Sequence, residues 1–188
     1  MRIDILSCGI FRPELDIAIA EIRDNFKGHN IEITYLPPSL HVYPLKMEEE
    51  LTKNLDKMKD SKVLVLYGSM CHADLPEIAE KYNALVPKEK NCIEIMLRPE
   101  IKNEMDKTGN INYLTAGWLK TWKEISADGA MIGDKIIYLD CGANLISDEE
   151  ILYFFDCANL PIETVPITLD NFKEVIIKLC KEIIEPKE

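Results

Sequence analysis

Short runs rich in β-branched residues alternate with helix-like stretches along the chain. Parallel strands need a crossover between them, usually a helix, so this alternation predicts strand–helix–strand units with right-handed connections. The strand-like runs are 3–7, 31–36, 62–67, 111–114, 135–139 and 162–167, with a weaker one at 84–86. We therefore expect an α/β fold, doubly wound and Rossmann-like, with a mostly parallel sheet of about six or seven strands and helices on both faces.

Helical patterns fill the intervals between these runs. A helix is expected to begin at Pro13 and to stop before Gly28, and another pattern, over 92–105, is interrupted by Pro99. The remaining helices are predicted over 46–59, 75–82, 149–159 and 171–184. With 188 residues and no linker or repeat, the chain is predicted to form a single domain spanning 1–188.

The charge balance limits the classes of partner. The formal net charge is −11, which repels phosphate backbones and anionic lipids, so nucleic-acid and membrane binding are not expected. No apolar stretch approaches the roughly 18 residues that span a bilayer, and the N-terminal sequence lacks a signal-peptide pattern. A cytoplasmic location is expected, where cysteines are thiols or metal ligands rather than disulfides.

Cysteines follow several of the predicted strands. Cys8, Cys71 and Cys141 come after the strands at 3–7, 62–67 and 135–139, and Cys92 stands at the start of a helical pattern. Because ligands of parallel sheets bind at the carboxyl ends of the strands, we expect these four cysteines on one edge. Near helix N-termini their thiols are expected to have lowered pKa values and to bind soft metals.

A single cysteine at a strand end is more often a small buried residue than a ligand. Cys157 and Cys180, which lie on apolar helix faces, are assigned to packing. No CxxC pair is present, so neither a zinc ribbon nor a ferredoxin-type ligand run is predicted. The P-loop, the GxGxxG fingerprint and the GxSxG elbow are also missing.

Charged side chains near these cysteines are candidates for catalysis and binding. His72 is a candidate general base or fourth ligand, with a solvent-facing histidine as the alternative. Glu94 is a candidate base, and Arg98 could meet an anionic substrate, although the i, i+4 spacing also suits an intrahelical ion pair between the two.

The segment from Tyr113 to Trp122 is the most distinctive aromatic stretch. Thr115 lies in an expected strand-to-helix turn, and Trp118 and Trp122 are one helical turn apart. Thr115 and Trp118 are predicted to bind substrate, with the tryptophans either covering a ligand or packing in the core.

Several of these motifs, in this order, resemble the family catalogued as domain of unknown function 1638. The resemblance rests on Ser7-Cys8-Gly9, Arg12-Pro13-Glu14-Leu15, Tyr67-Gly68-Ser69-Met70-Cys71, Asn91-Cys92-Ile93-Glu94-Ile95-Met96-Leu97 and Tyr113-Leu114-Thr115-Ala116-Gly117-Trp118. It implies a cytoplasmic protein of methanogenic archaea or anaerobic bacteria, encoded near corrinoid-dependent methyltransferases for methylamines, and hence a role in one-carbon metabolism. The family pattern carries cysteines at Cys8, Cys71 and Cys92.

The leading hypothesis is a 4Fe–4S cluster held by Cys8, Cys71 and Cys92, with one iron open to a small-molecule substrate. An enzyme of this kind would be an iron–sulfur-dependent lyase, desulfidase or transferase. Alternatives are a Cys₃ zinc site, metal-free thiol chemistry with Cys71 as nucleophile, and a non-catalytic accessory of a corrinoid protein or methyltransferase. A homodimer is also considered.

Overall fold

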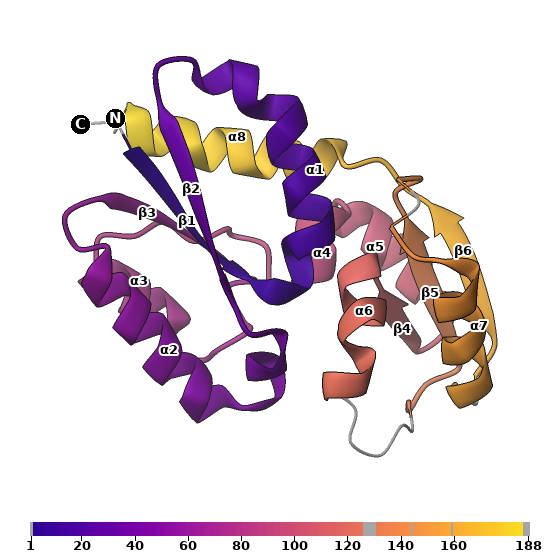
Figure 1. Ribbon diagram of the computed structural model, residues 1–188. Helices are drawn as coiled ribbons and strands as arrows, with labels where there is room; N and C mark the ends of the chain where they lie inside the picture. The colour runs from indigo at the N-terminus through magenta and orange to yellow at the C-terminus, as the bar shows by residue number, and fades with distance from the viewer. Residues whose placement is uncertain (1, 126–130, 144, 159, 186–188) are drawn as a thin grey trace.

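The computed structural model describes residues 2–125, 131–143, 145–158 and 160–185. Its six named strands are all parallel to their neighbours and form two three-stranded sheets, ordered β2-β1-β3 and β4-β5-β6 (Figure 1). The strands are β1 (Arg2–Cys8), β2 (Asn30–Leu36), β3 (Lys62–Leu66), β4 (Ile111–Leu114), β5 (Lys135–Asp140) and β6 (Ile162–Pro166).

The α/β class and the parallel direction of the strands are confirmed, but the single sheet of six or seven strands is wrong. The weak run at 84–86 makes one isolated parallel bridge, between Leu64 and Leu85, and does not lengthen the first sheet. Between β3 and β4 the chain forms three helices and then starts a second sheet. Alternation of strands and helices fixes the direction of each strand, but it does not determine which strands pair.

The helices end close to the predicted positions. They are α1 (Arg12–Ile22), α2 (Pro44–Lys57), α3 (Leu75–Lys81), α4 (Cys92–Met96), α5 (Pro99–Asp106), α6 (Ala116–Ile125), α7 (Asp148–Cys157) and α8 (Asp170–Ile184), with 3-10 turns at Gly9–Phe11, Arg23–Phe26 and Pro38–Val42. Pro99 divides the 92–105 pattern into α4 and α5, as expected, because proline cannot continue a helix but suits its first turn.

The helices cover both faces of the first sheet. Helices α1 and α8 contact each other on one side, while α2 lies beside α3 on the other, where Tyr82 at the end of α3 donates a hydrogen bond to Asp56 of α2 at 2.9 Å (Figure 1). In the second sheet, α6 contacts α7.

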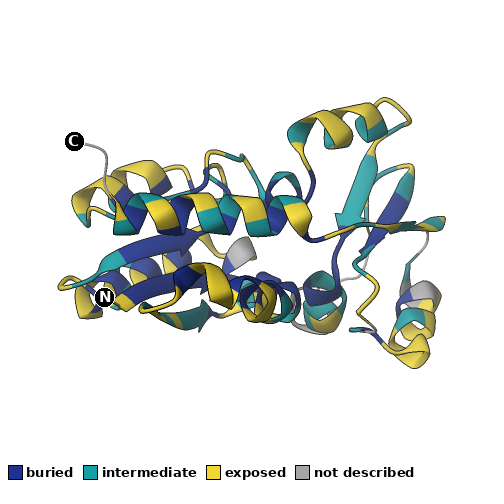
Figure 2. Cartoon of the chain, turned by 90° about the horizontal axis from the view of Figure 1, so that it is seen from above, coloured by how far each residue is buried: buried dark blue, intermediate teal, exposed yellow. Residues whose placement is uncertain are grey.

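The main core extends from the first sheet towards the second. It contains β1 and β3, the inner face of α8, and Ile137 and Leu139 of β5. Phe11 and Phe172 connect α1 to α8, with ring centroids 5.1 Å apart. Figure 2 shows the buried residues gathered on the strands of the first sheet and on the helix faces turned towards it. No described helix is both long and apolar enough to cross a membrane.

Candidate functional site

Two of the predicted ligands stand at the carboxyl end of the first sheet. Cys8 ends β1, and Cys71 lies in the loop that follows β3. In the register of these strands Ser7 is opposite Leu66, so Cys8, the last residue of β1, and Tyr67, the first residue after β3, follow at the same level.

The third predicted ligand reaches this edge through a close backbone contact. The loop at 68–70 lies against the segment at 89–91, because Ser69 N–H donates to the Glu89 carbonyl at 2.8 Å and Met70 N–H donates to the Lys90 carbonyl at 3.0 Å. A Cβ on Gly68 would lie 2.3 Å from Cα of Asn91, so only glycine allows this approach. Cys71 and Cys92 are thereby brought together.

Each of the three sulfur atoms receives a hydrogen bond that favours the thiolate form. Cys8 is hydrogen-bonded by the backbone of Ile10, Cys71 by the backbone of Cys92, and Cys92 by the side chain of Trp118, in each case lowering the pKa of the thiol. The thiols also act on one another: charge on Cys71 raises the pKa of both Cys8 and Cys92. The three side chains therefore form one electrostatically coupled group.

Burial nevertheless dominates the protonation of these thiols. It raises the pKa of Cys8 and of Cys92 to about 12, and it raises the pKa of Cys71 as well. The expectation of lowered pKa values was wrong, because burial penalises the thiolate more than the hydrogen bonds stabilise it. Without a cation at this site the three cysteines are neutral thiols near pH 7.

The three sulfur atoms do not form a compact group. Among the described residues, one set of three or more histidine, cysteine, aspartate or glutamate side chains has its ligand atoms all within 4.8 Å of one another, and it consists of Glu48, His72 and Asp74. Zn–S bonds of about 2.3 Å would place three thiolates on one zinc ion about 3.8 Å apart. At least one pair among Cys8, Cys71 and Cys92 is therefore further apart than a single zinc ion would hold it.

The other cysteines lie elsewhere. Cys141 follows β5 in the second sheet, and burial and the charge of Glu14, not the other thiols, raise its pKa. The expectation that it shares an edge with the other three was therefore wrong, since it rested on a single sheet. Cys180 is buried in α8 as predicted, and the side chain of Cys157 is outside the described part of the chain.

A cavity of about 380 Å³ opens beside Cys92. Trp118 and Trp122 of α6 line it together with Tyr113, and Asn91 and Asn112 add amide groups. Trp118 and Cys92 thus border the same cavity. Neither Thr115 nor Arg98 is among the residues that line this cavity.

His72 and Glu94 are held by structural hydrogen bonds. His72 is 7% exposed, so the solvent-facing interpretation was wrong, and its Nδ1 accepts a hydrogen bond from the backbone N–H of Asp74 at 3.2 Å. Glu94 accepts from the backbone N–H of Lys90 at 2.9 Å, while Asn91 caps α4 by accepting from the Glu94 N–H at 3.0 Å. Both side chains therefore fix the loops that carry Cys71 and Cys92.

Arg98 does not line the cavity beside Cys92. Helix α4 ends at Met96, so Arg98 is not on the same helix as Glu94 and the expected intrahelical pair does not form. Instead its guanidinium pairs with Glu174 of α8 at 3.0 Å. It borders a different cavity, beside Ile167 and Asn171.

Thr115 lies next to a buried acid that the sequence analysis did not single out. Glu14, in the first turn of α1, is 1% exposed, and its Oε1 accepts a hydrogen bond from the Gly117 N–H at 3.3 Å. Its Oε2 and the Oγ1 of Thr115 are both buried without a hydrogen-bond partner of standard geometry. The small residues of Thr115-Ala116-Gly117 were the only sequence sign of this close approach.

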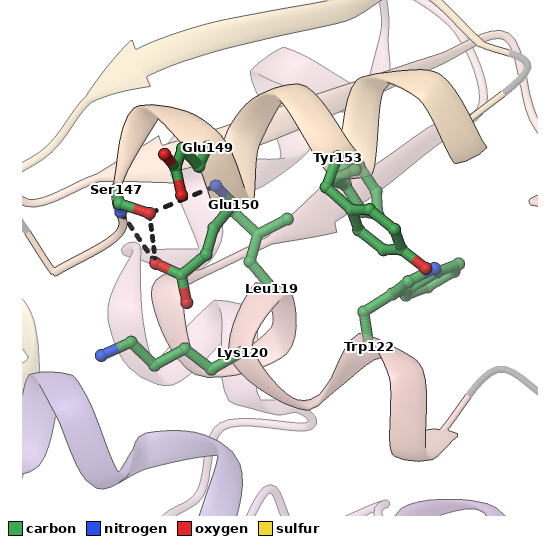
Figure 3. A pocket seen from close by; sticks show the side chains of 8 residues that line it. Leu119, Lys120, Trp122, Ser147, Glu149, Glu150 and Tyr153 are labelled. Atoms are coloured by element: carbon green, nitrogen blue, oxygen red, sulfur yellow. Dashed lines mark hydrogen bonds between the residues drawn. The ribbon is translucent and has the colours of Figure 1, made fainter.

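A second surface cavity, of about 440 Å³, lies between α6 and α7 (Figure 3). The rings of Trp122 and Tyr153 lie at one end of it, and Lys120 and Glu150 lie at the other. Glu150 completes a capping box with Ser147 at the start of α7. None of the predicted site residues lines this cavity.

The comparisons with known proteins identify the family. A family model described as a protein of unknown function, DUF1638, matches residues 35–176. The chain belongs to this family. The search of curated proteins and the search of solved structures gave no match. Membership of DUF1638 confirms the resemblance found in the sequence, and of the three cysteines on which the resemblance depends, the matched region contains Cys71 and Cys92.

Proposed function

We propose that Cys8, Cys71 and Cys92 bind a 4Fe–4S cluster whose fourth iron is open to a small-molecule substrate. The observation that carries this proposal is the meeting of three cysteines from three separate segments at one sheet edge, each with a hydrogen bond directed at its sulfur. Hydrogen bonds to ligand sulfurs stabilise thiolates and tune the potentials of iron–sulfur clusters.

The spacing of the sulfurs does not suit a single zinc ion. Three ligands of a cubane are separated by about 6–7 Å, because each binds a different iron. The sulfurs of Cys8, Cys71 and Cys92 are not all within 4.8 Å of one another, so they are not arranged as three ligands of one zinc ion.

The burial of the Cys71 thiol argues against the alternative of a metal-free thiol enzyme. A nucleophilic cysteine acts as the thiolate, whereas burial raises the pKa of Cys71, the candidate nucleophile. A cluster would supply positive charge in the same place, displace the protons, and stabilise the fold as it binds.

The cavity beside Cys92 is where we place the substrate. Its volume, about 380 Å³, is at the lower end of the range for small-molecule sites, and the aromatic side chains of Tyr113, Trp118 and Trp122 form part of its wall. An open iron next to it would act as a Lewis acid on a bound oxygen, nitrogen or sulfur atom. Such a site suits lyase, desulfidase or transferase chemistry.

We place this activity in anaerobic one-carbon metabolism in the cytoplasm, with a corrinoid protein or methyltransferase as partner. The family resemblance is the support for this setting, and the net charge of −11 would steer the chain towards a basic surface on the partner.

The test is the metal and acid-labile sulfide content of the protein, purified without oxygen, together with its visible spectrum. We expect about four irons and four sulfides per chain in the wild type and in Cys180→Ala, whose cysteine is buried in α8. In Cys92→Ala we expect loss of the cluster. A wild-type protein that holds no iron after anaerobic reconstitution, or equal iron in both variants, would contradict the proposal.

A further inference from the structure

The hydroxyl of Tyr67 is buried at the candidate site without a conventional hydrogen-bond partner. Tyr67 is 1% exposed and is among the largest fully buried side chains of the described residues. Its Oη has no hydrogen-bond partner of standard geometry. Buried tyrosine hydroxyls usually have a partner, so this one calls for a physical explanation.

Tyr67 lies among the cysteines. It leaves the sheet beside Cys8, one residue beyond the paired Ser7 and Leu66, and it directly precedes Gly68, which permits the contact with Asn91. The Cys8 thiol is close enough for a weak hydrogen bond, and charge on Cys71 also reaches the hydroxyl. The unpartnered donor is therefore directed into the group of thiols.

A neutral thiol is a weak acceptor, so Cys8 by itself gives this hydroxyl little compensation for its lost hydration. Phenylalanine would fill nearly the same volume at this position without that cost. A thiolate bound to iron is an anionic acceptor, and hydrogen bonds to ionised groups are shorter and about twice as strong as neutral ones. The hydroxyl is thus well placed only when the sulfur beside it carries negative charge.

We propose that Tyr67 is a positioning residue that donates its hydroxyl hydrogen bond to the Cys8 sulfur when that sulfur is a cluster ligand, and that this bond raises the reduction potential of the cluster. The inference rests on the proposed function. Reduction adds negative charge to the cluster and its ligands, so a donor on a ligand sulfur stabilises the reduced form more than the oxidised form.

The experiment compares Tyr67→Phe with Tyr138→Phe in anaerobically purified, cluster-loaded protein. Tyr138, on β5, is a control because it is also a buried tyrosine, but the cysteine near it is Cys141. Iron and sulfide content and far-UV circular dichroism establish that both variants fold and hold the cluster. A potentiometric titration followed by the visible spectrum then gives the midpoint potential.

We expect Tyr67→Phe to keep its iron and to have a lower midpoint potential than the wild type. A roughly tenfold change in the ratio of reduced to oxidised cluster corresponds to about 59 mV for a one-electron couple. We also expect the variant to lose one exchangeable proton that couples to the reduced cluster in pulsed electron paramagnetic resonance.

The outcomes separate the two proposals. A wild-type protein without iron would overturn the cluster and this inference together. A cluster in both proteins, with the Tyr67→Phe potential shifted no more than that of Tyr138→Phe and the same exchangeable protons, would overturn the role of Tyr67 alone. Should Tyr67→Phe fail to hold its cluster, the exchangeable proton is sought by comparing cluster-loaded wild-type protein in H₂O and in D₂O, and its absence there would overturn the inference.

Discussion

Gly117 donates its backbone N–H to Oε1 of Glu14 at 3.3 Å, and this hydrogen bond joins the start of α6 to the first turn of α1. The two helices belong to different sheets, since α1 follows β1 and α6 follows β4. Burial raises the pKa of Glu14 to about 7, although hydrogen bonds from backbone N–H groups, that of Gly117 among them, lower it. Glu14, which is mostly protonated only below pH 7, thus lies where helices of the two sheets meet.

We predict that Glu14 makes the protein less stable as the pH rises. The pKa of Glu14 is higher in the folded chain than its ordinary value of 4.5, so the proton favours folding; the stabilisation is full below 4.5 and is lost as the pH rises through 7. The loss from this group is about 3 kcal/mol. Tyr138 and Cys141, whose charges would act on it, have raised pKa values and stay neutral over this range.

The Glu14→Gln variant should remove this dependence. Glutamine keeps an acceptor for the Gly117 N–H and stays neutral, so urea unfolding at pH 5, 6, 7 and 8 should show a flatter profile and a more stable protein at pH 8. Parallel profiles for the two proteins would show that Glu14 titrates normally.

The Gly117→Ala substitution should destabilise the protein. Replacing glycine by alanine within a helix usually stabilises a protein by about 0.5–1 kcal/mol. Here the new Cβ would lie 1.6 Å from the carbonyl oxygen of Ile10, a backbone atom that cannot turn aside, so we expect a loss of about 1–3 kcal/mol or more. Lys120→Ala, at an exposed position of the same helix, should stay within about 0.5 kcal/mol of the wild type in thermal unfolding.

Substitutions of Asn91 and Glu94 should show whether these residues only hold the start of α4 in place or are needed for iron binding. Asn91→Ala removes the cap that accepts from the Glu94 N–H, and we expect a loss of about 1 kcal/mol in stability and a lower iron content. Glu94→Gln keeps an oxygen for the Lys90 N–H, so stability and iron content should hardly change. A variant of Glu94 that loses its iron would show that this carboxylate is needed in its charged form.

Alkylation rates should rank the thiols of the metal-free protein. Cys8 and Cys92 are 4% and 8% exposed, whereas Cys141 is half-buried. At pH 7.5 we expect iodoacetamide to label Cys141 well before Cys8 and Cys92, and to label all three at similar rates in urea. Fast labelling of Cys92 in the folded protein, followed by mass spectrometry of its peptide, would restore the thiol-nucleophile hypothesis.

The sequence predicted the elements well and their assembly less well. The run at 111–114 is β4, and Pro99 separates α4 from α5 as expected, because local propensity determines these features. The division into two sheets depends on contacts between distant segments, such as the approach of Gly117 to Ile10, which no periodicity reveals.

At the candidate site, too, the sequence pattern did not reveal contacts between distant segments. The rule that ligands lie at strand ends correctly placed Cys8 and Cys71 on one edge, but it failed for Cys141, since it presupposed a single sheet. Glu14 was not recognised, because an acid in the first turn of a helix is ordinarily exposed and favourable there. Tyr67 belonged to a motif, yet only the structure revealed that its hydroxyl is unpartnered.

Helix α8 follows β6 of the second sheet and returns to cover the first, where Phe172 meets Phe11. All three cysteines of the site precede it in the chain by at least 78 positions, since Cys92 is the last of them and α8 begins with Asp170. During synthesis the sheet that carries Cys8 is therefore made first and is closed last, after α8 has emerged from the ribosome. The apolar face beneath α8 therefore stays uncovered until α8 itself has been made.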